Sequence, residues 1–215
     1  MKVIDLSHLM CSNMPVYSQA GSPSFQITHI LERDGFKETK YIIYSHTGTH
    51  IDAPGHMINS GPNLDNLDIN HFFGKATMLD FCHHKDLHIS IQDLFPHQEK
   101  ISKVDFVILK TGWDQHWGKS QYYTSYPYLN EKSAEWLTRF NLKGIGVDAI
   151  SIDQSESIDF AVHKILLSQK TIIIENLTNL DAIENEYFMF CAFPLKIKNA
   201  DGSPIRAVAL ENSCK

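Results

Sequence analysis

Residues 44–57 read YSHTGTHIDAPGHM and place three histidines and one aspartate beside glycine and proline, which restricts how this part of the chain can fold. His46, His50 and Asp52 have the spacing HxxxHxD. Imidazole nitrogen and carboxylate oxygen are ligands that zinc and similar divalent ions take, and catalytic zinc sites usually keep three protein ligands plus a water. The pattern therefore indicates a metal site. The alternative is a polar surface loop that happens to be rich in histidine.

Backbone geometry decides whether His46 and His50 can share an ion. On a continuous strand they would lie on one face but about 13 Å apart, which is too far. A helix would bring them together, but the threonines and glycine between them, and Pro54 beyond, disfavour one. We therefore expect Gly48 to break the strand with a bulge or tight bend that folds His46 back toward His50.

His56 follows the turn at Pro54 and Gly55 and is expected near the ion but outside its ligand set. An imidazole in that position titrates close to neutral pH and can exchange a proton with an activated water. We therefore predict His56 as the catalytic acid or base.

A second pair of candidate ligands lies much later in the chain. His163 is in the helical segment AVHKILL, and Glu175 ends the apolar run TIIIEN. A carboxylate at the end of a buried strand needs a partner or access to solvent, and ligand sites favour the carboxyl ends of strands in α/β sheets. Each residue alone has an ordinary structural explanation. Together with the first motif they would hold the same ion, or a second ion bridged by Asp52.

Composition excludes several classes of protein. The 215 residues carry a net charge of −6 with a pI near 6.0, which argues against binding nucleic acid or an anionic membrane. The first ten residues contain Asp5 and His8, so we do not expect a signal peptide, and no run approaches the apolar length of a membrane span. Four scattered cysteines without a CxxC pair indicate reduced thiols and a cytoplasmic protein.

The pattern of apolar runs predicts an α/β fold, which we treat as one domain over residues 1–215. The middle of the chain alternates strand and helix, and both ends are rich in strands. A mixed sheet fits this better than a doubly wound fold. Gly144 is expected to end the helix before it, and a turn at 200–202 to close a terminal β-hairpin. Strands are expected at 2–8, 25–32, 40–52, 76–81, 104–113, 144–153, 170–177, 188–199 and 203–211, and helices at 130–144 and 161–169.

The segment HTGTHIDAPGH resembles the HxGTHxDxPxH signature of the cyclase-like metal-dependent hydrolases, which include bacterial kynurenine formamidase (arylformamidase) and isatin hydrolase. Other blocks are similar to the same family in the same order: IDLSHLMCSNMPVY, ILKTGW, GVDAISID and HKILL…IIIENLTNL. The resemblance covers most of the chain. Two departures border the substrate pocket of that family: SQAGSP at 18–23 replaces a Pro-Gly-Asp run, and Ile150 stands where proline is common.

The resemblance implies a β/β/α sandwich that forms homodimers. It makes His46, His50 and Asp52 metal ligands and His56 the acid/base, while His163 and Glu175 complete a second site with Asp52 bridging. The cofactor would be Zn²⁺, one or two ions per subunit, with Mn²⁺ as the metal of the isatin hydrolases.

The expected function is hydrolysis of an amide by metal-activated hydroxide. N-formylkynurenine would give kynurenine and formate, a step in tryptophan catabolism, and isatin or another cyclic amide or lactone is the alternative substrate. Phe25, Tyr44 and Trp113 are candidates to wall a pocket for an aryl ring.

Two other classes remain open. His50-x-Asp52 followed by His163 also matches the facial triad of non-haem iron oxygenases, although the helix–strand alternation disfavours their all-β barrel. A non-catalytic binding protein that keeps a structural ion is the second. The pair His84 and His88 has a helical metal spacing, but it follows a strand and is expected in a solvated loop.

Overall fold

The computed structural model describes residues 1–18 and 21–212. Its centre is a nine-stranded mixed sheet in the order β1-β13-β11-β5-β7-β9-β10-β4-β12. The strands are β1 Lys2–Asp5, β4 His50–Asp52, β5 Phe73–Asp80, β7 Phe106–Lys110, β9 Gly144–Val147, β10 Ile172–Glu175, β11 Tyr187–Cys191, β12 Gly202–Pro204 and β13 Val208–Glu211. The four central strands β5, β7, β9 and β10 run parallel, and the strands on either side are antiparallel. The predicted α/β fold with a mixed sheet and strand-rich ends is confirmed.

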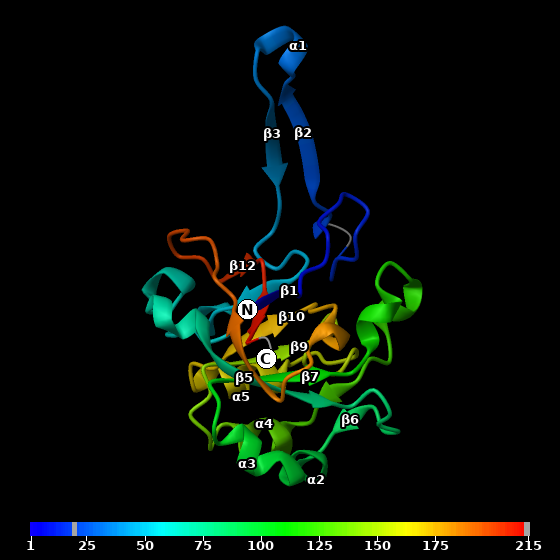
Figure 1. Cartoon of the computed structure of the whole chain (residues 1–215), viewed down its shortest axis with the longest axis vertical. Helices are drawn as coiled ribbons and strands as arrows, with labels where there is room; N and C mark the ends of the chain where they lie inside the picture. The colour runs from blue at the N-terminus through cyan, green and yellow to red at the C-terminus, as the bar shows by residue number, and fades with distance from the viewer. Residues whose placement is uncertain (19–20, 213–215) are drawn as a thin grey trace.

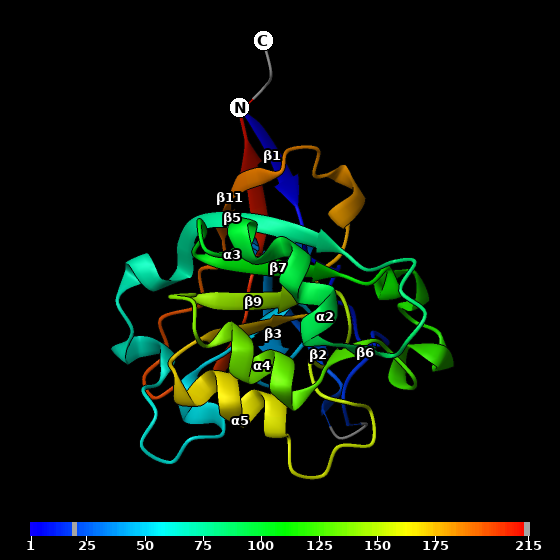
Figure 2. The ribbon, with the colours of Figure 1, turned by 90° about the horizontal axis from the view of Figure 1, so that it is seen from below.

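The central strands are buried on both faces, which explains their continuous apolar runs. In β7, Val107 and Leu109 face the core under the helices, whereas Phe106 and Ile108 face the opposite core. Helices cover the first face (Figure 2). They are α2 Ile91–Leu94, α3 Gln98–Ile101, α4 Glu131–Leu137 and α5 Ala161–Ser168. The second core lies between the central strands and the curled antiparallel ends of the sheet, which contribute Ile4, Phe190 and Ala209.

Two small pairs of strands stand apart from this sheet. β6 His88–Ile89 pairs with β8 Tyr128–Leu129, and β2 Ser24–His29 pairs with β3 Glu38–Ile42 across a short helix α1, Leu31–Asp34. The β2–β3 hairpin projects from the body as a long arm (Figure 1). Gly35, with a φ of 75°, ends α1 and turns the chain toward β3.

Two expectations about these elements are wrong, and a third is right in its pairing but not in its turn. The strand expected over 40–52 is split, because β3 ends at Ile42 and β4 belongs to the main sheet. Gly144 does not end a helix: α4 stops at Leu137, and Gly144 lies in β9, where a Cβ would come within 2.7 Å of Ile172. The predicted terminal hairpin is confirmed in its pairing, because β11 lies antiparallel to β13 and Pro194 bridges Ile205 in the same register. Its connection is longer than the expected turn at 200–202 and includes β12, which pairs with β4.

Candidate metal centre

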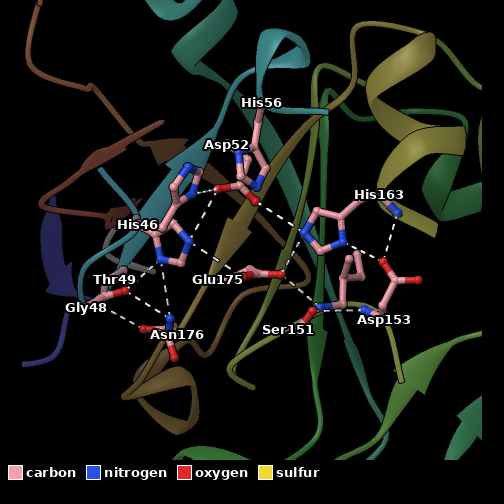
Figure 3. Close-up of polar contacts among 12 residues, drawn as sticks. His46, Gly48, Thr49, Asp52, His56, Ser151, Asp153, His163, Glu175 and Asn176 are labelled. Carbon is pink, nitrogen blue, oxygen red and sulfur yellow. Dashed lines mark hydrogen bonds and ion pairs between the residues drawn. The ribbon is translucent and has the colours of Figure 1, made fainter. Parts of the chain in front are cut away.

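Strand register brings the first motif and the later carboxylate together. β4 pairs antiparallel with β10, and His50 lies directly opposite Glu175. Asp52, two residues along β4, shares the face of His50. This face is the one beneath α5, whose first turn carries His163. Residues separated by more than a hundred positions therefore converge at the end of two neighbouring strands (Figure 3).

Gly48 supplies the bend that the HxxxHxD spacing requires. Its φ is 68°, a left-handed conformation that glycine adopts without strain. The bend returns His46 to the site, so that its ring centroid lies 5.2 Å from that of His50. The predicted break at Gly48 is confirmed. The Gly48 carbonyl also accepts hydrogen bonds from His50 Nδ1 at 2.8 Å and from the Asn176 amide at 2.9 Å.

Asp52 is the centre of the cluster and is only 1% exposed. Its Oδ1 lies 2.6 Å from His46 Nδ1 and 3.3 Å from His50 Nε2, and its Oδ2 lies 3.5 Å from His163 Nε2. Burial alone would raise the pKa of Asp52, but the positive charges on His50 and His46 outweigh burial and hold this pKa well below its usual range. A buried carboxylate that touches three imidazoles is a strong anionic centre.

Glu175 joins the site from the opposite strand and is also buried. Its Oε2 lies 3.5 Å from His50 Nε2, and its Oε1 lies 3.3 Å from His163 Nε2 and accepts the backbone N–H of Ile152. Donor atoms therefore gather into two triads that share Asp52: His46, His50 and Asp52, and Asp52, His163 and Glu175.

The chemistry and spacing of these donors fit a divalent cation. Two ligand atoms that are each about 2.1 Å from a tetrahedral ion lie about 3.4 Å from one another. The contacts of His50 Nε2 with both carboxylates, and of His163 Nε2 with both, span 3.3–3.5 Å, which suits a shared ion better than a hydrogen bond. Three imidazoles with two carboxylates are typical donors for zinc or manganese.

Groups behind the donors fix their orientation. His163 Nδ1 bonds Asp153, whose carboxylate also accepts the backbone N–H groups of Val162 and His163 at the start of α5. His50 Nδ1 is held by Gly48 O, and the amide of Asn176 is held in turn by the hydroxyl of Tyr122. In both histidines Nε2 is the nitrogen directed at the carboxylates, the arrangement that metal-binding histidines need.

His56 lies beside this cluster at the end of a 3₁₀ turn, Pro54–His56, and its ring centroid is 3.9 Å from that of His46. Burial lowers the pKa of His56, and the positive charges on His46 and His163 add to this, against the attraction of Asp52. A neutral imidazole at physiological pH can accept a proton. His56 Nδ1 lies 3.4 Å from the carboxylate of Asp201, which is also 3.0 Å from His46 Nε2.

The site opens into a cavity of about 300 Å³ with a mainly apolar wall. Its wall includes Tyr17, Met57, Ile150 and Phe160, and its floor carries the histidines and carboxylates. Phe160 has a φ of 50°, a strained conformation for a bulky residue and one that is concentrated at functional sites. Of the two departures from the family pattern, Ile150 lines this cavity, and residues 19–20 of the other lie outside the described residues.

The aromatic residues expected to wall the pocket lie elsewhere. Phe25 packs edge-on against Tyr41 in the arm, Tyr44 is 57% exposed beside the arm's base, and the indole of Trp113 donates to the carbonyl of Tyr122. None of the three lines the described cavity, and Tyr17 and Phe160 take that position. The local sequence could not predict which aromatic residues line the cavity. That depends on how the loop before α5, which carries Phe160, folds over the site.

Three acidic or amide groups of the site gave no signal in the sequence. Asp153, Asn176 and Asp201 stand singly in their segments and acquire partners only through the fold. His84 and His88 belong to none of the metal-compatible groups in the described residues. His84 Nε2 contacts the carbonyl of His88, and His88 lies in strand β6 instead of the expected loop. Cys11, Cys82 and Cys191 are free thiols, and Cys214 lies outside the described residues.

The mixed sheet and the histidine–carboxylate site together define an α/β protein with a candidate metal centre. A family model described as "Putative cyclase" matches residues 4–154. The chain belongs to this family, the cyclase-like metal-dependent hydrolases.

Individual relatives agree with that assignment. A kynurenine formamidase of Bacillus cytotoxicus is 29% identical over 95% of this chain and 95% of its own. A solved structure described as a potential metal-dependent hydrolase with cyclase activity has a TM-score of 0.81 and is 28% identical, covering 97% of this chain and 96% of the other. An isatin hydrolase bound to a product analogue has a TM-score of 0.89 at 22% identity, covering 98% and 92%, and shares the fold.

None of the helices within the described ranges has the length and apolar character that crossing a membrane requires.

Proposed function

We propose that this chain is a metal-dependent amidohydrolase that cleaves the C–N bond of an aryl formamide, with N-formylkynurenine as the substrate and kynurenine and formate as products. The observation that carries the proposal is the convergence of three imidazoles and two carboxylates, centred on Asp52, at the floor of an apolar cavity with His56 beside them. The similarity to a kynurenine formamidase supports the choice of substrate.

The metal would be held by His46, His50 and Asp52 in one position. A second ion would be held by Asp52, His163 and Glu175, so that Asp52 is common to the two positions. Zinc suits these donors, and manganese is the alternative. A divalent cation bound there lowers the pKa of a coordinated water from 15.7 toward roughly 7 and polarises a carbonyl oxygen.

His56 would move the proton. Its lowered pKa leaves it neutral near physiological pH, so it can take the proton of the attacking water. The same imidazole then gives that proton to the nitrogen of the leaving amine as the C–N bond breaks. An aryl amine is a better leaving group than an alkyl amine, so one modest acid is enough.

The cavity would select the substrate by shape and polarity. Its volume of about 300 Å³ lies at the small end of ligand pockets, and Tyr17 and Phe160, with ring centroids 6.4 Å apart, would pack against an aryl ring. The second candidate is hydrolysis of a cyclic amide such as isatin. The same donors and apolar wall would serve it, and the fold of an isatin hydrolase matches this chain over 98% of its length.

The test combines elemental analysis of purified protein with hydrolysis assays on N-formylkynurenine and isatin, run without oxygen or reductant. We expect zinc or manganese at one or two ions per chain, release of formate from N-formylkynurenine, and loss of activity with a chelator. Turnover that requires oxygen and a reductant would instead identify an iron oxygenase. Protein that binds both compounds without product would identify a binding protein.

Two variants separate the roles within the site. His56→Ala should keep the metal and lose turnover by about a hundredfold or more, whereas Asp52→Ala should lose the metal. Metal loss in His56→Ala, or full metal retention in Asp52→Ala, would contradict the assigned roles.

A further inference from the structure

Ser151 lies in the segment that follows β9 and borders the metal cluster (Figure 3). Its neighbour Ile150 lines the cavity. The backbone N–H of Ile152 donates to Glu175 Oε1 at 2.9 Å, and the carboxylate of Asp153 orients a metal-binding histidine. Ser151 also lines the cavity, although it is only 3% exposed. Its hydroxyl therefore belongs to the wall that a bound substrate would touch.

The Ser151 hydroxyl has two hydrogen-bond partners in the protein. The backbone N–H of Asp153 donates to Ser151 Oγ at 3.3 Å. The hydroxyl of Tyr126, a fully buried residue, forms the second bond with Ser151. Tyr126 does not line the cavity, and its hydroxyl has no other acceptor recorded within residues 1–18 and 21–212. Because an unpaired buried donor is costly, the O–H of Tyr126 donates to Ser151.

These two bonds decide which way the Ser151 hydroxyl can act. A serine hydroxyl has two lone pairs and one hydrogen, so two accepted bonds use its acceptor capacity. Its own hydrogen has no acceptor among the residues that the structure describes. Since Ser151 borders the cavity, a ligand there can supply that acceptor. The fold therefore presents Ser151 as a hydrogen-bond donor toward the cavity.

The rest of the cavity wall offers few other donors. Ile150 and Phe160 present apolar groups. The amide of Asn176 is already bound to the carbonyl of Gly48. The hydroxyl of Tyr17 belongs to a side chain that is 60% exposed. An acceptor atom buried against this wall without a donor would lose binding energy, so a substrate that carries one there needs the Ser151 hydroxyl.

The two candidate substrates share an acceptor of this kind. In N-formylkynurenine a ketone carbonyl stands on the ring carbon next to the one that carries the formamide nitrogen. In isatin a ketone carbonyl has the same relation to the ring nitrogen. Hydrolysis attacks the amide carbonyl in both compounds and leaves the ketone unchanged. The ketone oxygen therefore needs a donor on the cavity wall.

We propose that Ser151 is a specificity-determining residue that donates a hydrogen bond to a ketone oxygen ortho to the reacting nitrogen. The site then prefers ortho-acyl aryl formamides, and fused cyclic amides that carry the same ketone. This inference rests on the proposed amidohydrolase function and narrows its substrate class. Ser151 is close enough to the metal cluster, because its Cα is about 3.8 Å from that of Ile152, whose N–H binds Glu175.

Two formamides of matched size test the proposal. N-(2-acetylphenyl)formamide carries the ketone, and in N-(2-ethylphenyl)formamide two hydrogen atoms replace the ketone oxygen. With metal-loaded protein, Ser151→Ala should raise the KM for the ketone compound about tenfold at nearly constant kcat, because the lost bond stabilises substrate and transition state equally. The KM for the ethyl compound should stay within about twofold. The ratio of the two effects cancels the intrinsic reactivity of each compound.

Two further variants serve as controls. Ser133→Ala is the matched control, because Ser133 is also buried and its hydroxyl donates to the carbonyl of Ile89, away from the cavity. This variant should change neither KM. Tyr126→Phe keeps the ring and removes the hydroxyl that makes Ser151 a donor. It should raise the KM for the ketone compound alone, and by less than Ser151→Ala does.

The outcomes separate a role in recognition from a role in the fold. Equal loss for both formamides in Ser151→Ala, or a lower metal content by elemental analysis, would show that Ser151 only supports Asp153 and would overturn the proposal. An unchanged KM for the ketone compound would overturn it too.

A binding measurement keeps this test independent of turnover. If the wild type hydrolyses neither formamide, the proposed function fails, and calorimetric binding of 2-acetylaniline and 2-ethylaniline still decides the role of Ser151. The wild type should bind the ketone amine about tenfold more tightly, and Ser151→Ala should remove that difference. Equal binding of the two amines to the wild type would overturn the proposal.

Discussion

Asp153 both caps helix α5 and orients His163: its carboxylate accepts the backbone N–H groups of Val162 and His163 at 2.9 and 3.0 Å and also bonds His163 Nδ1. The helix end and the ring that it carries are therefore fixed by one side chain. Burial opposes a charge on His163, but the bonds to Asp153, Asp52 and Glu175 outweigh burial and raise its pKa well above the usual value.

Asp153→Asn should weaken metal binding by about 10- to 100-fold, the usual effect of removing a group that orients a metal-binding histidine. Loss of the cap should cost about 1 kcal/mol of unfolding free energy as well. Competition with a chelating dye measures the first and urea denaturation the second. Asp159→Asn, next to α5 but without a contact to His163, is the control and should change neither. Equal metal affinity in both variants would contradict the orienting role.

Gly202 makes room for His46. A Cβ built on Gly202 would lie 2.5 Å from His46 Cε1 and 2.8 Å from Nε2, and no positive φ is involved. Gly202→Ala should therefore displace the imidazole and reduce metal affinity by roughly tenfold, with less than about 1 kcal/mol of lost stability because β12 is an edge strand. Gly21→Ala, whose Cβ would meet only Tyr44 at 3.9 Å, is the control. Unchanged metal affinity in Gly202→Ala would show that His46 is not held in this position.

The sequence predicted the metal donors of this site, including the distant His163 and Glu175, but not the groups that orient them. The bend at Gly48 follows from residue spacing, because two histidines four apart on a strand cannot share an ion. The buried strands β7 and β10 follow from their apolar runs. Asp201 carries no such pattern, since its partner His46 is 155 positions away and is brought near only by the pairing of β12 with β4.

The wrong expectations about the fold also arise because local sequence does not show which distant strands pair. Residues 40–52 look like one strand because their β-branched and aromatic content is continuous. The chain nevertheless leaves the arm at Ile42 and enters the main sheet at His50, because β4 pairs with β10. Gly144 resembles a helix terminator, but its lack of a side chain serves the packing of Phe106 and Ile172 across β9. Both outcomes depend on neighbours that the local sequence does not contain.

Metal binding should release protons. The charge and hydrogen bond of Asp52, assisted by Asp201, outweigh burial and raise the pKa of His46 to about 9, and the pKa of His163 is raised too. Near neutral pH the metal-free site therefore holds protons that a cation must displace, so affinity rises with pH, and the contribution of His46 to this rise levels off above about 9. Each displaced proton changes affinity about tenfold per pH unit.

Calorimetric titration in buffers of different ionisation enthalpy counts the protons directly. We expect at least one proton released per ion near neutral pH. In His46→Ala the release should fall along with affinity. A binding constant that does not change between about pH 7 and 9, with no buffer dependence, would contradict protonated ligands in the free site.

Asp201 should position His56 and set its pKa. The carboxylate raises the pKa of His56, although burial and the neighbouring histidines keep it low. In Asp201→Asn we expect kcat to fall by roughly tenfold with little change in KM or metal content, because the base is misplaced. Since the anion is gone, the acid limb of the pH–rate profile should move to lower pH.

Asp65→Asn is the matched control for Asp201, because Asp65 accepts the backbone N–H of Asn199 in the same loop without contacting either histidine. Its profile should match that of the wild type. Metal loss in Asp201→Asn would show that Asp201 serves His46 as a ligand partner instead of positioning His56.

His8 should make the fold sensitive to acid. Its ring stacks on Trp117 with centroids 3.8 Å apart, and its Nε2 is buried without a hydrogen-bond partner in the described residues. Burial lowers the pKa of His8 from 6.5 to about 4, against a weaker opposing effect of Asp114. Between about pH 6.5 and 4, His8 therefore binds a proton in the unfolded chain but not in the folded chain. This contribution to stability is complete above about pH 6.5 and is lost as the pH falls toward 4.

His8→Phe keeps the stacking and removes the titration. Between about pH 7 and pH 5 the wild type should lose about 1 kcal/mol more unfolding free energy than this variant, after allowance for partial solvent exposure. Urea denaturation at the two pH values gives the difference, and His83→Phe on an exposed turn should behave as the wild type. A parallel loss in wild type and His8→Phe would show that protonation of His8 costs the folded state nothing, and would place the acid sensitivity among the carboxylates instead.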